Sequence, residues 1–514
     1  MDWRTDRRGL LRAGGTLFAG LALAPKFAWA ADGKTLRLRV SSDFQVLDPK
    51  GEIGELDDII PRCCTVTLTR LSDMRAGNTI SPYAAKVYEW KDLTTLAFTL
   101  QDGLKWTGDF GPVTVADVKY SFERIAGSDS AWAYQFEKLK EVEVVDEKSG
   151  LIHLSAPFKP FDVVAVPYYG GHLVCKAATE KAGGTFTTAF PAQCGPYLFD
   201  TWDQNAKITL KRNPDWPLEK PQWDNIEFYI VTDDQAALLA YEAHSFDFTK
   251  VAVASSKDLK ANPPANTAMI QAASTRYVWL TINMNAPTLK DLRVRQAIQY
   301  AYDGDSVIEG AYDGLTTRAT GVVQGKFARP ANLIGKRDVA KAKALLAEAG
   351  VKDLTLQLYC TTDSVAQAIA QIIQASLAEA GITVQIQPTE DAAYWALGDK
   401  TKGDGYKSIE LVLMNFAGGI DPTENLVWFR PDQIGVYNWS FFDSPEYEDL
   451  YQKSLAEQDE AKRTEMFHHM EDLMEQSGAF IFICFEPYLA IGNANLTPVI
   501  LADGHPDPTR FTAT

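Results

Sequence analysis

The sequence predicts an α/β protein. The main observation is an alternation of helix and strand over residues 338–387, where two stretches with helical apolar spacing each lead into a short strand-like run. A second observation is the segment 35–40, in which apolar and polar residues alternate as in a half-buried strand. The first pattern favours parallel strands joined by right-handed crossovers, and ligands bind at the carboxyl ends of such strands.

The elements within residues 338–387 are predicted from their end signals. Asp338 is expected to cap the first helix and Gly350 to end it, because aspartate accepts from free amides and glycine tolerates the left-handed conformation. A strand is expected at 354–359. A second helix is expected over 364–380, followed by a second strand at 382–386.

Outside that region the elements are predicted from local patterns. Residues 93–106 are expected to form a hairpin around an Asp-Gly turn. Thr114 is expected to open a helix, with Asp117 completing a pair that resembles a capping box. Near the C terminus, one long polar helix is expected over 444–476 and an apolar strand over 480–483.

The first 30 residues have the layout of an export signal. The adjacent Arg7 and Arg8 precede a weakly apolar stretch and a small-residue cleavage site at 28–30. Paired arginines indicate Tat-type export, and the apolar stretch is shorter than the roughly 20 residues that a membrane span needs. We therefore expect residues 1–30 to be removed, and the mature protein to be periplasmic and not inserted in the membrane.

The charge of the chain argues against two classes of partner. The formal net charge is −17 over 514 residues. Residues 1–30 carry five basic and two acidic side chains, so their removal leaves −20. A strongly negative protein is repelled by nucleic acid and by anionic membrane surfaces. Neither is expected as a partner, and the charge mildly favours cationic ligands without identifying one.

The cysteines are interpreted in the light of export. Cys175 and Cys194 close a short loop that contains glycine and proline, and we expect a disulfide between them, which an oxidising compartment allows. Cys360 and Cys484 lie in apolar strand-like runs and are expected to be buried thiols. The pairing of the adjacent Cys63 and Cys64 is left open.

The sequence contains no motif of a common enzyme class. It has no Gly-x-Ser-x-Gly elbow, no phosphate-binding Gly-rich loop and no His-Glu-x-x-His. It also lacks a Cys-x-x-Cys pair, and its six histidines are scattered. We therefore expect a protein that is not an enzyme and has neither a metal site nor a cofactor.

Five blocks, in this order along the chain, resemble one family. They are 47–49; 100–106 continued by 114–124; 195–197 with 210–216; 291–303; and 442–447. Together they make the chain similar to the large periplasmic substrate-binding proteins of peptide, nickel and opine ABC transporters.

The resemblance implies a domain organisation. It implies a two-lobed periplasmic-binding-protein fold with a two-stranded hinge, in which lobe one carries an extra subdomain. Here lobe one is expected at 31–273, with the subdomain inserted at about 61–169. Lobe two is expected at 274–487, and residues 488–514 return to lobe one.

The resemblance also implies a function. The chain is expected to be the substrate-binding component of an ABC importer, a monomer that captures a peptide between its lobes and delivers it to an inner-membrane permease. An opine, a polyamine or a sugar-like compound is the alternative ligand. An exported hydrolase is the alternative from another class, and use of the same cleft for sensing or as a chaperone is a third.

The sequence departs from the dipeptide-binding members of the family at two positions. These members hold the peptide amino group with an acidic residue and its carboxylate with an arginine, and the matching positions here are Gly419 and Cys360. A buried charge without its partner is costly, so a tight dipeptide site is disfavoured. Longer peptides bound through their backbone remain compatible. A nickel ligand is disfavoured because the loop around Gly419 contains no histidine.

The candidate ligand contacts come from three places. The first is a loop whose glycines allow close backbone approach, comprising Asn415, Phe416, Ala417, Gly418, Gly419 and Asp421. The alternative for this loop is an ordinary turn capped by Asp421. The second is Phe44 with Gln45, expected to face the loop across the cleft, with core packing as the alternative for Phe44. The third is a set of aromatic residues beside lobe-two loops, Tyr394, Trp395 and Tyr437.

Overall fold

The computed structural model describes residues 34–514 except 52–54, 78 and 131. The predicted export signal, residues 1–30, lies outside the described residues. Within the described part of the chain, no helix combines the length and the apolar character needed to cross a membrane.

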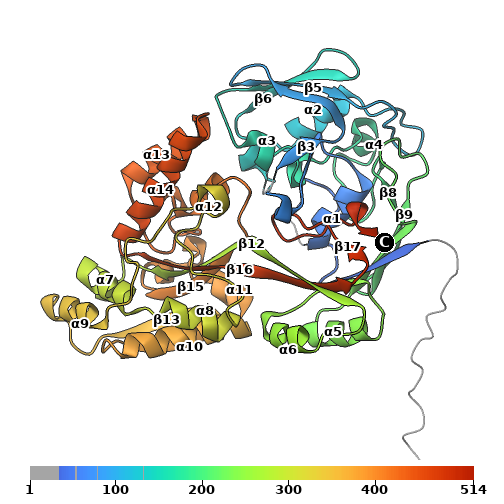
Figure 1. The fold of residues 1–514 in the computed structure, drawn as a ribbon. Helices are drawn as coiled ribbons and strands as arrows, with labels where there is room; N and C mark the ends of the chain where they lie inside the picture. Colours follow the sequence, from blue (N-terminus) through green and yellow to red (C-terminus); the bar gives the residue numbers. More distant parts are fainter. Residues whose placement is uncertain (1–33, 52–54, 78, 131) are drawn as a thin grey trace, which may run out of the picture. The chain divides into compact units, whose positions relative to one another are not determined.

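The main sheet has ten strands and is divided by its two longest members. In sheet order the strands are β14 (Thr383–Thr389), β13 (Thr355–Thr361), β15 (Leu411–Phe416), β12 (Thr267–Ile282), β16 (Phe480–Asn493), β11 (Phe248–Lys250), β1 (Thr35–Val40), β10 (Asn225–Ile230), β9 (Lys207–Arg212) and β8 (Tyr197–Asp203). The long strands β12 and β16 lie side by side in the middle (Figure 1). We call β11, β1, β10, β9 and β8 the first half-sheet, and β15, β13 and β14 the second half-sheet.

Each central strand pairs with one half-sheet and with the other central strand. The C-terminal part of β16 pairs with β11, and the C-terminal part of β12 pairs with β15. β12 and β16 are antiparallel partners along almost their whole length, but their register shifts between Ala273 and Tyr277. The chain therefore crosses between the half-sheets on two adjacent strands whose pairing is interrupted at residues 274–276.

The second half-sheet confirms the predicted alternation of helix and strand. Helix α9 (Val339–Glu348) begins after Asp338, whose carboxylate accepts from the Lys341 N–H at 2.8 Å. Helix α10 (Ser364–Ala378) connects β13 to β14, and the two strands are parallel. Apolar side chains from β12, β13 and α10 are buried with those of α7 (Leu292–Ala301) and α8 (Gly304–Tyr312) in one core.

The first half-sheet has a separate core. β1 is a strand, as its alternating sequence predicts, and pairs in parallel with β10 and β11. Its apolar side chains are buried with those of β9, β10 and helix α1 (Glu55–Cys64). Each Leu or Ile buried in this way contributes about 1.5–3 kcal/mol, so each half-sheet is stabilised by side chains of its own.

A four-stranded sheet lies between β1 and β8 in the sequence. Its order is β4 (Ala85–Trp90), β5 (Thr95–Leu100), β7 (Ser149–Leu154) and β6 (Leu139–Val144). Helix α2 (Val115–Glu123) packs on it, and the Thr114 N–H donates to the Asp117 carboxylate at 2.9 Å, which confirms the predicted capping pair.

The predicted hairpin at 93–106 is wrong in its partners. Gly103 has a φ of 82°, so the turn conformation is as expected. However, β5 pairs with β4 and β7, and residue 105 forms only a bridge to Pro112. Cross-strand packing between distant segments decides the pairing here, and local turn chemistry does not report it.

The predicted long polar helix is two helices. They are α13 (Pro445–Ala456) and α14 (Glu460–Gln476). Glu457 is extended, with a ψ of 126°, and the Asp459 carboxylate accepts from the N–H groups of Ala461 and Lys462. A cap within the polar run thus starts a new helix.

The predicted disulfide is not formed in the structure. Cys175 and Cys194 are both buried free thiols, and burial raises the pKa of the Cys194 thiol well above its usual value. Both side chains belong to a large apolar core, which accommodates a thiol as a small apolar group. Cys360 and Cys484 are buried free thiols, as expected.

Candidate functional site

A cavity of about 160 Å³ lies where the loop after β15 meets the N-terminal part of the chain. The loop 417–420 forms one wall, together with the side chains of Glu424 and Trp428. The opposite wall comes from segments 132–135 and 163–169, and Asp503 completes it. This cavity is therefore lined on one side by the segment that follows β15, and on the other side by segments from earlier in the chain and by Asp503.

Glycine is required in the loop because it approaches other parts of the backbone closely. A β-carbon at Gly418 would lie 2.5 Å from the carbonyl oxygen of Thr275, and one at Gly419 would lie 2.5 Å from the side-chain β-carbon of Glu424. The Gly418 N–H donates to the Thr275 carbonyl at 3.1 Å, and the Thr275 hydroxyl donates to the Gly418 carbonyl at 2.6 Å. The loop is thus tied to the interrupted segment of β12.

Asp421 does not line the cavity, which corrects its assignment as a ligand contact. It is buried, and both of its oxygens accept from the Arg463 guanidinium, at 2.6 and 2.7 Å. It also accepts from the N–H and hydroxyl of Thr423. Burial opposes ionisation, but Arg463 and Thr423 outweigh it and hold the pKa of Asp421 below its usual value. Asp421 therefore caps an ordinary turn, which was the alternative interpretation of this loop.

Glu424 is the charged group of the loop side that reaches the cavity. It belongs to helix α12 (Thr423–Leu426), and its Oε2 accepts from the Tyr134 hydroxyl at 3.0 Å and the Gln135 amide at 3.2 Å. Both donors come from the short 3₁₀ helix η2 (Ala133–Phe136) on the opposite wall. Burial raises the pKa of Glu424 to about 7. Sequence reasoning missed Glu424, because nothing local separates it from a solvent-facing glutamate.

An aromatic cluster surrounds the start of the loop. The Phe416 ring stacks on Trp395 at 5.8 Å and meets Tyr437 and Trp428 edge-on at 5.6 and 5.9 Å. Trp395 and Tyr437 are exposed, at 39% and 38%, whereas Tyr394 is buried. The sequence-predicted Phe416, Trp395 and Tyr437 are therefore brought together.

The predicted residues divide between two cavities. Ala417, Gly418 and Gly419 line the cavity already described. Asn415, Tyr394 and Trp395 line a smaller one of about 30 Å³, beside the carboxyl end of β13.

Phe44 and Gln45 line neither cavity, which corrects their expected position across the cleft. The Phe44 ring packs against Trp202 and Phe199, at 4.6 and 5.9 Å. Core packing, the alternative for Phe44, is what the structure shows. Gln45 is exposed, and its N–H donates to Asp57 at 2.6 Å.

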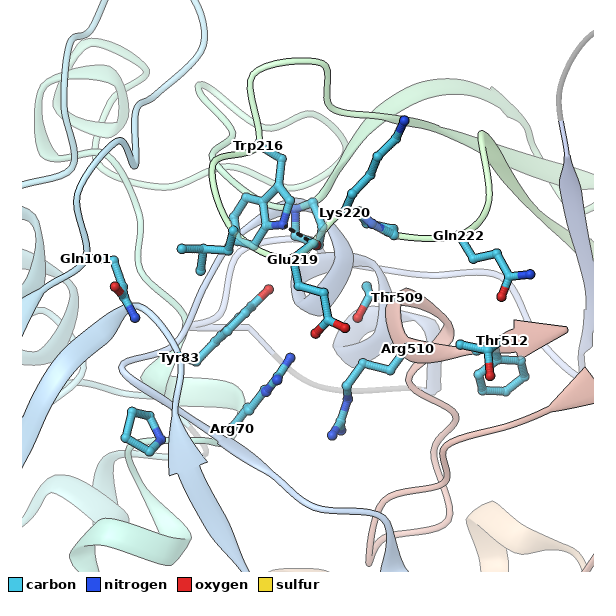
Figure 2. A pocket seen from close by; sticks show the side chains of 15 residues that line it. Arg70, Tyr83, Gln101, Trp216, Glu219, Lys220, Gln222, Thr509, Arg510 and Thr512 are labelled. Carbon is cyan, nitrogen blue, oxygen red and sulfur yellow. Dashed lines mark hydrogen bonds between the residues drawn. The ribbon is translucent and has the colours of Figure 1, made fainter. Parts of the chain in front are cut away.

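A larger cavity of about 480 Å³ lies elsewhere (Figure 2). All of its lining residues come from 70–222 and 509–512, including Arg70, whose guanidinium lies over the Tyr83 ring at 5.2 Å. No residue of the second half-sheet lines it. A ligand there would not contact the segment that follows β15, whereas a ligand in the smaller cavity at Glu424 would contact both that segment and residues 132–169, so the smaller cavity is the better candidate.

One cluster near the cavity has the residue types of a metal site. The ligand atoms of Asp58, Asp503 and His505 lie within 4.8 Å of one another. However, the Arg62 guanidinium donates to both oxygens of Asp58, at 2.8 and 3.0 Å, and so neutralises its charge. The arrangement fits a buried ion-pair network better than a cation site, because a guanidinium repels a metal ion.

The fold and the cavity define a class. The chain has two half-sheets with separate cores, joined by two interrupted strands, and a cavity between segments from both sides. This is the architecture of a two-lobed binding protein, in which a ligand is held between lobes that move about a hinge.

Comparison with known proteins identifies the family. Residues 79–431 match the model of the bacterial extracellular solute-binding proteins, family 5 Middle. The chain belongs to this family. The expected resemblance is thereby confirmed.

Individual relatives cover most of the chain. The probable D,D-dipeptide-binding periplasmic protein DdpA of Escherichia coli is 26% identical over 413 residues, which cover 78% of each chain. The glutathione-binding protein GsiB of Escherichia coli is 25% identical over 502 residues, covering 94% of this chain and 95% of its own. Both are named as binding proteins and neither as an enzyme.

A solved structure shows the same fold. The ABC transporter substrate-binding protein CtaP of Listeria monocytogenes superimposes with a TM-score of 0.83 at 22% identity, covering 94% of this chain and all of its own. The two-lobed α/β fold expected from the sequence is confirmed.

Proposed function

We propose that this protein is the substrate-binding component of an ABC importer and captures a peptide in the cavity between its lobes. Membership of the solute-binding family supports the first part, and the relative named for D,D-dipeptides supports the second. The observation that carries the proposal is the cavity lined by Gly418 and Glu424 on one side and Tyr134 on the other. A ligand there contacts both lobes and favours the closed form.

The proposed lobes meet at the interrupted segment of the central strands. Lobe one comprises residues 31–273, lobe two 274–487, and residues 488–514 return to lobe one. The register shift between Ala273 and Tyr277 supports this boundary. The four-stranded sheet of β4 to β7 supports an extra subdomain at about 61–169.

The absence of both dipeptide anchors favours a peptide longer than a dipeptide. Gly419, at the position of the family's acidic anchor, lines the cavity without a side chain. Cys360, at the position of the arginine anchor, is fully buried in β13. With neither charged anchor in place, binding through the peptide backbone, which does not depend on the peptide sequence, is favoured.

We assign the ligand-contacting wall to Asn415, Phe416, Ala417, Gly418, Gly419, Tyr394, Trp395 and Tyr437. Their supporting observations are the two cavities and the aromatic cluster at the end of β15. The protein acts in the periplasm as a monomer after Tat-type export, and its partner is an inner-membrane permease. Family membership and the twin arginines, Arg7 and Arg8, support this location.

Thermal unfolding of the purified protein against a ligand panel tests the proposal. The panel contains dipeptides, tri- to pentapeptides, opines, polyamines and sugars. A ligand at 100 times its dissociation constant adds about 2.7 kcal/mol of stability, which raises the melting temperature measurably. Stabilisation by tri- to pentapeptides is expected. Stabilisation by opines, polyamines or sugars alone would show that the ligand belongs to one of those classes and is not a peptide.

A further inference from the structure

We propose that the cavity at Glu424 selects a cationic group of the ligand, which two carboxylates and aromatic faces hold. This inference rests on the proposed function and adds the charge of the ligand. The carboxylates are those of Glu424 and Asp503, from opposite walls. Neither stands at the position of the family's acidic anchor, which is Gly419 here.

The charges around the cavity are unbalanced. Its lining contains two carboxylates and no lysine, arginine or histidine. Glu424 accepts only neutral donors, Tyr134 and Gln135, and no ion pair to it is found in the described part of the chain. By contrast, the neighbouring Asp421 has Arg463 as a buried partner.

Asp503 supplies an independent observation. Its side chain is only 8% exposed, and its buried Oδ2 has no hydrogen-bond partner. The Nδ1 of His505 lies 3.6 Å from this oxygen and forms an ion pair with it when protonated, but its hydrogen bond goes to Asp58 at 3.0 Å. A buried carboxylate oxygen without a donor is costly, and a ligand with N–H groups would satisfy it.

Aromatic faces complete the selection. Trp132 stacks on Tyr169 with ring centroids 4.4 Å apart on one wall. Tyr134 meets Trp428 edge-on at 6.4 Å across the cavity. The faces of tryptophan and tyrosine attract an ammonium or guanidinium group. Carboxylates and rings together therefore favour a cation over a neutral or anionic group of equal size.

Protonation of Glu424 should oppose this binding. Its pKa is raised to about 7 by burial, so a proton competes with a cationic ligand near neutral pH. The titratable groups that interact with it are Tyr134 of η2, Tyr168, Tyr277 of β12, Tyr451 of α13 and Asp421. The tyrosines have raised pKa values and stay neutral, and Asp421 is ionised and paired with Arg463. Glu424 alone of these titrates near pH 7.

A binding competition between defined ligands tests whether the cavity selects a positively charged group. The protein is incubated with a random tripeptide library, the same library N-acetylated, and putrescine, and the retained molecules are quantified by mass spectrometry. We expect free tripeptides to be retained about tenfold more than acetylated ones, since each tenfold step in affinity needs only about 1.4 kcal/mol. Enrichment of lysine and arginine peptides in the acetylated pool would place the cation on a side chain instead of the terminal amine.

Matched variants test whether Glu424 and Asp503 cause the preference for a cation. In E424Q the amide oxygen still accepts from Tyr134 and Gln135, so the fold is expected to persist, which the melting temperature checks. E424Q and D503N should each reduce the preference for the free amine about tenfold, whereas E465Q, at an exposed position of α14, should not. Wild-type affinity should rise about tenfold from pH 5.5 to pH 7, a range in which the terminal amine (pKa about 7.7–8.0) stays protonated, and lose this dependence in E424Q.

The outcomes separate this inference from the proposed function. Equal retention of free and acetylated peptides without lysine or arginine enrichment would overturn the cation site and leave the peptide function in place. Retention of putrescine alone would support the cation site and overturn the peptide ligand. Failure of all three probes to bind would overturn both.

Discussion

At the scale of single residues, the charge of Asp421 serves the structure of the turn. Its two oxygens accept from the Arg463 guanidinium inside the protein. D421N should leave that guanidinium buried without a counter-charge and lower the free energy of unfolding by about 3–5 kcal/mol. Urea denaturation measures the loss. D449N, which removes a partner of the exposed Lys453, is the control and should change little. Equally small losses of unfolding free energy in D421N and D449N would show that Arg463 is solvated.

Glu471 makes the stability of the protein depend on pH. It is fully buried on α14, and its Oε1 accepts from the N–H groups of Val322 and Val323 at 2.7 and 2.9 Å. Burial raises its pKa to about 8 from 4.5 in the unfolded chain. The folded state therefore holds a proton that the unfolded state releases. This contribution is complete below pH 4.5, decreases as the pH rises, and is lost above about pH 8.

The substitution E471Q tests this dependence. The glutamine oxygen can still accept from both N–H groups, and its side chain does not ionise. Between pH 5 and pH 8.5 the wild type should lose on the order of 4 kcal/mol relative to E471Q. Denaturant unfolding at several pH values measures the difference, with E465Q at an exposed position as control. Parallel stability curves for wild type and E471Q would contradict the assignment.

At the scale of elements, prediction succeeded where the signal was local. The helices at 339–348 and 364–378 have an aspartate cap and an apolar stripe, and both were placed within a few residues. The partners of β5 were predicted wrongly, because β4 and β7 lie on either side of it in the sheet but up to about fifty residues away in sequence. The division between α13 and α14 at Asp459 was missed because the sequence is polar on both sides of it.

The loop after β15 depends on the absence of a β-carbon at Gly418. In G418A the new methyl group would meet the Thr275 carbonyl, and the loop must move away from β12. We expect the melting temperature to fall. We also expect at least a tenfold higher peptide concentration to be needed for the same stabilisation. G405A is the matched control, since a β-carbon there meets nothing within 4 Å. A peptide response unchanged in G418A would remove this loop from the site.

At the scale of the whole molecule, the sequence predicted which loop lies at the cavity but not what faces it. Ala417, Gly418 and Gly419 were identified because glycines after an apolar strand indicate close backbone approach. Tyr134 and Asp503 are separated from them by at least 283 and 84 positions, and only the tertiary fold brings them together. Phe44 was misplaced for the same reason, since an aromatic residue in a loop has no local sign of which side it packs on.

Thr275 connects the two sides of the molecule at the crossing strands. Its hydroxyl lies 2.6 Å from the Gly418 carbonyl in the β15 loop and 2.8 Å from the Ala502 carbonyl near the C terminus. Ala502 adjoins the cavity residue Asp503, so this hydroxyl bridges the two walls at the hinge. T275V keeps the shape of the side chain but leaves two buried carbonyls without this donor. Such a loss costs about 1–3 kcal/mol.

If the bridge favours the closed arrangement, T275V should weaken peptide affinity about tenfold. Small-angle X-ray scattering should show the ligand-dependent decrease in radius of gyration at correspondingly higher peptide concentration. T464V, which removes a hydroxyl bonded only to the Glu460 carbonyl of the same helix, is the control and should match the wild type. A T275V protein with reduced stability but unchanged affinity would mean that the bridge is present in the open and closed forms alike, and that closure depends on the ligand contacts alone.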